Sequence, residues 1–153
     1  MTPAVNFLKK NKVHFELLSF EHNPHTDNYG LEVVQQLNLA IEAVFKTLVL
    51  ETAEHDFIVA ITPVNQQVNM KLIAKAAGTK KAHMAKAADV ERITGYVLGG
   101  VSPFAQKKRL QVYLHEKAMQ QACIYVSGGK RGVEIAITPQ DLISALNAST
   151  AIF

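Results

Sequence analysis

Cysteine is almost absent from this sequence, since Cys123 is the only one among 153 residues. An intramolecular disulfide is therefore excluded, and a single thiol suits the reducing cytosol. No uninterrupted apolar run approaches the roughly 20 residues that a membrane-spanning helix needs. The first residues, MTPAVN, also lack the basic segment and apolar segment of a signal peptide. We therefore expect a soluble cytoplasmic protein that does not act at a membrane.

The signature motifs of the common enzyme classes are missing as well. The chain has no GxSxG elbow, no HExxH motif, no P-loop and no GxGxxG turn. His22, His25 and Asp27 lie close together in a polar loop, but no second ligand pair has zinc-site spacing, which favours surface histidines. Cys123 opens an apolar strand and is interpreted as a core residue rather than a nucleophile. The sequence thus predicts no metal site, no cofactor and no protein nucleophile.

The length and composition fit one globular domain spanning residues 1–153. The hydrophobic fraction is 48% and the charged fraction 19%, which argues against disorder. Apolar periodicity and capping residues predict helices that start at Pro3 and Pro139 and that cover 30–39, 69–77 and 88–94. Strands are expected over 13–17, 43–50, 57–61, 109–115, 123–126 and 133–137. Because these elements do not alternate strictly, we predict a mixed α/β fold. Its six or seven strands form a curled mixed sheet or barrel surrounded by helices.

Basic residues exceed acidic ones only slightly, with a formal net charge of +3 and a pI of about 9.0. They gather, however, in three parts of the chain. These clusters are Lys71 to Lys86, Lys107 to Arg109, and Lys130 with Arg131. If the clusters share a face, they form a patch that attracts phosphates. A solvated surface that keeps the protein soluble is the alternative interpretation.

Lys46 is unusual because it stands inside the apolar segment VFKTLVL, residues 44–50. An unpaired ammonium is very costly to bury, so this side chain must reach an open face or a partner. It either lies at an exposed sheet edge, where lysine is common, or projects into a cleft and binds an anion or a polarised oxygen. The strand pattern alone leaves both possibilities open.

Two glycine-rich turns form the second unusual feature. They have the sequences LGGVSP, residues 98–103, and SGGKRG, residues 127–132. Glycines let the backbone approach a ligand, and successive N–H groups can then stabilise a carbonyl oxygen as it becomes negative. Tight turns between strands are the alternative.

In this order, three segments resemble the YbaK-type aminoacyl-tRNA deacylases, relatives of the editing domain of bacterial prolyl-tRNA synthetases. The matching segments are VFKTL at 44–48, GYVLGGVSPF at 95–104 and SGGKRG at 127–132. The resemblance covers essentially the whole chain and implies a compact mixed barrel. Two residues depart from the family pattern. Ala105 stands where glycine is usual, and Glu134 where aspartate is common, which leaves an acidic role at Glu134 open.

The resemblance implies removal of cysteine wrongly attached to tRNA(Pro), in trans beside prolyl-tRNA synthetase, with Cys-tRNA(Cys) as a further substrate. In the mechanism proposed for this family, the substrate's own thiol attacks its ester carbonyl and a cyclic thiolactone is released. By hypothesis, Lys46 holds the terminal adenosine or the substrate's polar groups. The backbone amides around Gly99 and Gly100 and around Gly128 and Gly129 are expected to stabilise the oxyanion. The remaining candidates for substrate binding are Phe20 and Tyr29, expected to line the amino-acid pocket, and Thr47, Ser102 and Ser127, expected to hydrogen-bond the substrate.

Two other functions remain open from the sequence. A related deacylase for another amino acid, such as alanine, would need water as its nucleophile because alanine has no thiol. A binding module without catalysis would use the same pocket to hold a nucleotide or a tRNA end. The missing nucleophile is compatible with this second alternative.

Overall fold

The computed structural model describes all of residues 1–153, which fold into five α-helices, two short 3-10 helices and eight strands. The helices are α1 (Pro3–Lys10), α2 (Tyr29–Leu37), η1 (Ile41–Ala43), α3 (Met70–Ala77), α4 (Ala87–Thr94), η2 (Glu116–Gln120) and α5 (Pro139–Leu146). The strands are β1 (Glu16–Ser19), β2 (Phe45–Thr52), β3 (Phe57–Pro63), β4 (Ala82–Met84), β5 (Gln111–His115), β6 (Ile124–Ser127), β7 (Val133–Ile137) and β8 (Ser149–Ala151). The predicted mixed α/β fold is confirmed. No helix is long and apolar enough to span a bilayer.

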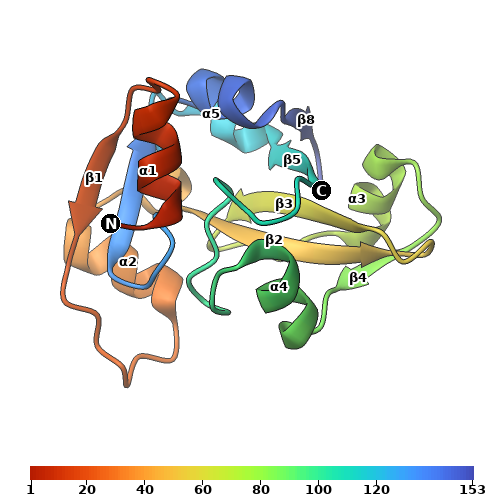
Figure 1. The fold of residues 1–153 in the computed structure, drawn as a ribbon, viewed down its shortest axis with the longest axis horizontal. Helices are drawn as coiled ribbons and strands as arrows, with labels where there is room; N and C mark the ends of the chain where they lie inside the picture. Colours follow the sequence, from red (N-terminus) through yellow and green to blue (C-terminus); the bar gives the residue numbers. More distant parts are fainter.

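The strands form two sheets that meet at the start of β2. The larger sheet has the order β4-β2-β3-β5-β8, with antiparallel pairs around β2 and parallel pairs on both sides of β5. The smaller sheet, β1-β7-β6, is antiparallel throughout. A parallel bridge between Val44 and Tyr125 joins the two sheets, so the strands follow a curled path, as the sequence predicted. In Figure 1, α1 and β1 lie at one end of the molecule, and α3 and β4 lie at the other.

The larger sheet separates two hydrophobic clusters because successive side chains of a strand point to opposite faces. On one face, Phe45 and Val49 join the larger cluster of 19 buried residues, which α1 and the smaller sheet complete. On the other face, Leu50 packs with α3 in a cluster of 8 buried residues. One edge of β2 has no strand partner between Val44 and Leu50, and the candidate site described below lies at this edge.

Helix boundaries follow the capping residues of the sequence. Thr2 and Thr138 each accept a hydrogen bond from a first-turn amide and precede a proline. Asn69 caps α3, and Gly78 ends it in the left-handed conformation at φ +72°. The predicted helix starts and the glycine stop are therefore confirmed.

The strand prediction differs from the structure most at three places, and the bounds of β2, β3, β5 and β6 also shift by one or two residues. The first strand begins at Glu16 rather than at 13, because Lys12 adopts a positive φ and the Val13 amide still bonds back to Leu8. Strands β4 and β8 were not predicted, and they raise the number from six or seven to eight. Each of the two has only three residues and exists through pairing with a longer neighbour.

Candidate functional site

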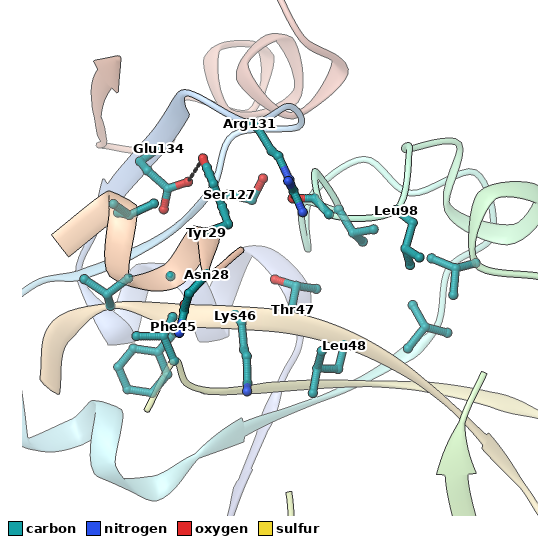
Figure 2. Close-up of a pocket in the computed structure, with 18 of the residues that line it drawn as sticks. Asn28, Tyr29, Phe45, Lys46, Thr47, Leu48, Leu98, Ser127, Arg131 and Glu134 are labelled. Carbon is teal, nitrogen blue, oxygen red and sulfur yellow. Dashed lines mark hydrogen bonds between the residues drawn. The ribbon is translucent and has the colours of Figure 1, made fainter. Parts of the chain in front are cut away.

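The open part of β2 is the centre of the candidate site. This strand pairs with β3 along Phe45–Glu51, but its other edge bridges β6 only at Val44 and pairs with β4 only from Leu50. A cavity of about 360 Å³ opens at this gap and is lined by the consecutive residues 44–49. The start of α2, the turn at 98–101 and the β6–β7 hairpin supply much of the remaining lining (Figure 2), and Val64, Met84, Ala85 and Val90 complete it. Segments that are far apart in the sequence thus face one space.

Thr47 lines this cavity and carries an unused hydroxyl. Its Oγ1 atom is buried and has no hydrogen-bond partner in the protein. Figure 2 shows it on the side of β2 where Tyr29, Ser127 and Arg131 lie. A buried hydroxyl without a partner destabilises the fold, so a ligand atom that bonds to it would recover that cost. The predicted role of Thr47 in substrate binding fits this geometry.

Lys46 also lines the cavity but projects to the other face of β2, as strand alternation requires. Figure 2 shows its ammonium directed away from the Thr47 hydroxyl. The side chain is half-buried and forms no ion pair. Burial lowers the pKa of this ammonium. Lys46 therefore offers an uncompensated positive charge at a different part of the site from the hydroxyl groups.

Tyr29 and Glu134 form a buried polar pair across the cavity. The Tyr29 hydroxyl donates to Oε2 of Glu134 at 3.3 Å and accepts from the Gly132 amide at 2.8 Å. Only 2% of Glu134 is exposed, and this burial raises the pKa of its carboxyl group to about 8. The pKa of Tyr29 is also raised, first by burial and then by the charge of Glu134. The tyrosine therefore stays neutral and holds the carboxyl group in place.

Arg131 closes the same wall and was not singled out by the sequence, where it appeared only within a basic cluster. Its guanidinium lies 5.2 Å from the centre of the Tyr29 ring, and its Nε donates to the Gly99 carbonyl at 3.4 Å. A cation above an aromatic face is favourable. Arg131 thereby links the two glycine-rich turns beside the cavity.

The glycine-rich turns pack against each other, and three of the four glycines predicted to act use their amides within the protein. The Gly100 amide donates to Val97, the Gly128 amide to Val133, and the Gly129 amide to the Ser127 hydroxyl. Gly99 lines the cavity at φ +91°, and its amide has no partner. Of the four glycines predicted to act, only Gly99 thus offers a free donor.

Gly100 and two further predicted residues have structural roles. A Cβ on Gly100 would lie 2.9 Å from the Lys130 Cα, so glycine is required where the turns touch. Ser102 is fully buried, and its hydroxyl accepts from the Phe104 amide at 3.3 Å. Phe20 lies outside the cavity and stacks on Tyr29 with ring centroids 6.1 Å apart. These three residues support the wall and do not line the cavity.

His22 and Cys123 have ordinary structural contacts. His22 Nδ1 lies 2.6 Å from the buried Glu32 carboxylate, and no three potential metal ligands gather anywhere in the chain. Cys123 is half-buried outside the cavity, with its thiol 3.7 Å from the Ile124 carbonyl. Burial raises the pKa of that thiol and so disfavours the reactive thiolate.

Comparison with known proteins shows what the chain as a whole is similar to. The family model described as the aminoacyl-tRNA editing domain matches residues 23–145. A protein of Enterococcus faecalis that carries the name Cys-tRNA(Pro)/Cys-tRNA(Cys) deacylase EbsC is 36% identical over 98% of this chain and 91% of its own.

Solved structures share the fold. One, described as a trans-editing enzyme for prolyl tRNA synthetase, has a TM-score of 0.85 at 18% identity and covers 99% of this chain and 97% of its own. The hypothetical protein APE2540 has a TM-score of 0.88 at 21% identity, covering 98% and 97%. At such identities these two structures establish the fold alone.

Proposed function

The chain belongs to the aminoacyl-tRNA editing domain family, and from this premise we propose that it removes cysteine from mischarged Cys-tRNA(Pro). The observation that carries the proposal is the similarity to the Cys-tRNA(Pro)/Cys-tRNA(Cys) deacylase of Enterococcus faecalis over nearly the full length of both chains. Cys-tRNA(Cys) is then a second substrate. The reaction takes place in the cytoplasm, in trans to the synthetase that made the error.

We propose that the substrate supplies the nucleophile. The cysteine thiol attacks its own ester carbonyl, a sulfur–carbon bond forms, and the bond to the tRNA oxygen breaks. The thiol proton ends on the released ribose hydroxyl, and the other product is a cyclic thiolactone. A thiol held beside its own ester has a large effective molarity, so orientation and charge stabilisation can suffice. The cavity suits this chemistry because no cysteine or serine–histidine pair lines it.

Individual residues would then have distinct tasks. The free Gly99 amide and the unpaired Thr47 hydroxyl are the donors that stabilise the developing oxyanion. Ser127 lies on the same wall and hydrogen-bonds the substrate. Lys46, on the other face of β2, holds the terminal adenosine end, where phosphates bring negative charge.

The cavity size is compatible with this substrate. A volume of about 360 Å³ lies within the range of roughly 300 to 1,000 Å³ that is usual for small-molecule sites. It can enclose an aminoacyl group while the rest of the acceptor stem stays outside. We propose that prolyl-tRNA synthetase contributes the selection of tRNA(Pro) and that the basic clusters contact the RNA backbone.

The test is a deacylation assay with purified protein and tRNA(Pro) carrying radiolabelled cysteine, alanine or proline. We expect rapid release of cysteine, with alanine and proline retained as in the enzyme-free control. Release of alanine in preference to cysteine would identify a different deacylase that activates water. Tight binding of the charged tRNA without any release would identify a binding module, and either outcome overturns the proposal.

A further inference from the structure

Glu134 carries a buried carboxyl group, and only one of its two oxygens has a hydrogen-bond partner in the protein. It lies on β7 directly opposite Ser127 of β6, so both side chains occupy the same face and both line the cavity. One carboxyl oxygen, Oε2, receives the Tyr29 hydroxyl at 3.3 Å. Only 2% of the residue is exposed, and the other oxygen, which forms no hydrogen bond within the protein, keeps a small accessible surface.

No cation of the protein compensates this carboxyl group. None of the four ion pairs of the chain includes Glu134. Arg131, the nearest basic wall residue in sequence, is held over the Tyr29 ring and bonded to Gly99. The Lys46 ammonium points to the opposite face of β2. A buried carboxyl group without a cation is costly, so a ligand cation that pairs with it would recover that cost.

Glu32 shows how the same fold treats a buried carboxylate that has only a structural role. It is 6% exposed, yet one oxygen lies 2.6 Å from His22 Nδ1 and the other accepts from the Asn23 amide at 2.7 Å. Although burial acts to raise the pKa of Glu32, these contacts hold it below its ordinary value. Glu32 also lies outside the cavity lining. Of these two buried carboxyl groups, Glu134 is therefore the one without a cationic partner in the protein.

An aminoacyl ester carries one cation close to its reacting carbonyl, the α-ammonium group. We propose that Glu134 binds the α-amino group of the substrate and thereby restricts this protein to aminoacyl esters whose amino group is free. This inference rests on the proposed deacylase function and adds a specificity determinant to it. N-acylated and peptidyl esters, which lack that charge, are then excluded, so growing peptides on tRNA are spared.

A double-mutant cycle between enzyme and substrate tests this directly. The two substrates are Cys-tRNA(Pro) and its analogue in which the α-amino group is replaced by hydroxyl, which removes the charge without adding bulk. The two enzymes are wild type and Glu134→Gln, which keeps the size and can still accept from Tyr29. Each rate is divided by the spontaneous hydrolysis rate of the same ester. Wild type should prefer the amino substrate by about tenfold to a hundredfold, and Glu134→Gln should lose that preference.

A binding arm separates this inference from the proposed activity. The probe is 3′-amino-3′-deoxyadenosine acylated with cysteine through a stable amide, compared with its N-acetyl derivative by calorimetry. Tighter binding of the free amine by wild type, abolished in Glu134→Gln, supports the inference even if no ester is cleaved. The matched control is Glu32→Gln, which removes the neighbouring buried carboxylate and should leave the amine preference intact. Equal preference in wild type and Glu134→Gln, in either arm, overturns the assignment.

Discussion

Removing the carboxyl group of Glu134 is expected to stabilise the protein, and the gain should grow with pH. Burial raises the pKa of this group from an ordinary value of 4.5 to about 8 in the folded protein. Between these two values the unfolded chain releases the proton while the folded protein retains it. The contribution of this group to stability is therefore complete below about pH 4.5 and is lost as the pH rises through about 8. Glutamine stays neutral and avoids that loss.

The magnitude follows from the pKa difference of about 3.5 between the two states. Each pKa unit corresponds to about 1.36 kcal/mol, so the wild type loses up to about 5 kcal/mol between pH 4 and pH 9. Relaxation of the cavity and entry of water reduce this figure, and we expect a measured loss of about 2 to 4 kcal/mol. That amount is large beside the roughly 5–15 kcal/mol of a typical domain.

Urea unfolding of wild type and Glu134→Gln at pH 5 and at pH 8.5 measures the effect. The stability difference between the two proteins should widen by about 2 to 4 kcal/mol at the higher pH. Glu32→Gln provides the opposite control. The pKa of Glu32 is lowered, so its contribution is present at neutral pH and is lost as the solution becomes acidic. Parallel stability curves for wild type and Glu134→Gln would refute the argument that Glu134 is an uncompensated buried acid.

Three further substitutions probe the site and its surroundings. Lys46→Ala should lower deacylation at least about tenfold without loss of fold, because it removes the free cation of the cavity. Lys9→Ala on the surface of α1, outside the three basic clusters, is its matched control, and full activity of folded Lys46→Ala would exclude the role. Thr47→Val should lower the deacylation rate while leaving the free energy of unfolding equal or about 1 kcal/mol higher, because it deletes a buried hydroxyl without a partner. Chemical denaturation and rate measurements test this together, and a loss of stability that accompanies the loss of rate would indicate a purely structural role. Cys123→Ser should keep its activity, and lost turnover at unchanged Tm would reveal a protein nucleophile.

Local sequence patterns predicted most of the fold because capping and apolar periodicity act within a few residues. Thr138 with Pro139 starts α5, and Gly78 ends α3, as those patterns indicate. Strands β4 and β8 could not be predicted in this way. Each has only three residues, which is too short for an alternating apolar pattern to be recognised. They are strands because they pair with β2 and β5. Their existence depends on tertiary structure rather than on local preference.

The candidate site was predictable only in part, for a similar reason. Lys46 and Thr47 stood out because polar residues inside an apolar strand need an explanation. The glycine-rich turns were recognisable, but whether an amide is free depends on the hydrogen bonds within each turn. Those bonds occupy Gly100 and leave Gly99 available. Sequence patterns do not resolve that difference between neighbouring glycines.

The pair of Tyr29 and Glu134 was beyond reach from the sequence because 105 positions separate the two residues. Tyr29 was expected to line the amino-acid pocket, and in the structure it lines the candidate cavity. Its partner Glu134 comes close to Tyr29 only in the folded protein, where β7 pairs with β6. The sequence pointed to Glu134 only through the family resemblance, in which an acidic residue is common at this position.

The most direct test of the account compares Cys-tRNA(Pro) with Ser-tRNA(Pro) under single-turnover conditions, with the binding of each measured separately. Serine has nearly the same size as cysteine, but its hydroxyl is a far poorer nucleophile near neutral pH than a thiol. If the substrate thiol attacks the ester, the cysteine ester is cleaved and the bound serine ester persists as it does without enzyme. Rapid hydrolysis of bound Ser-tRNA(Pro) would contradict this mechanism and show that the protein activates water.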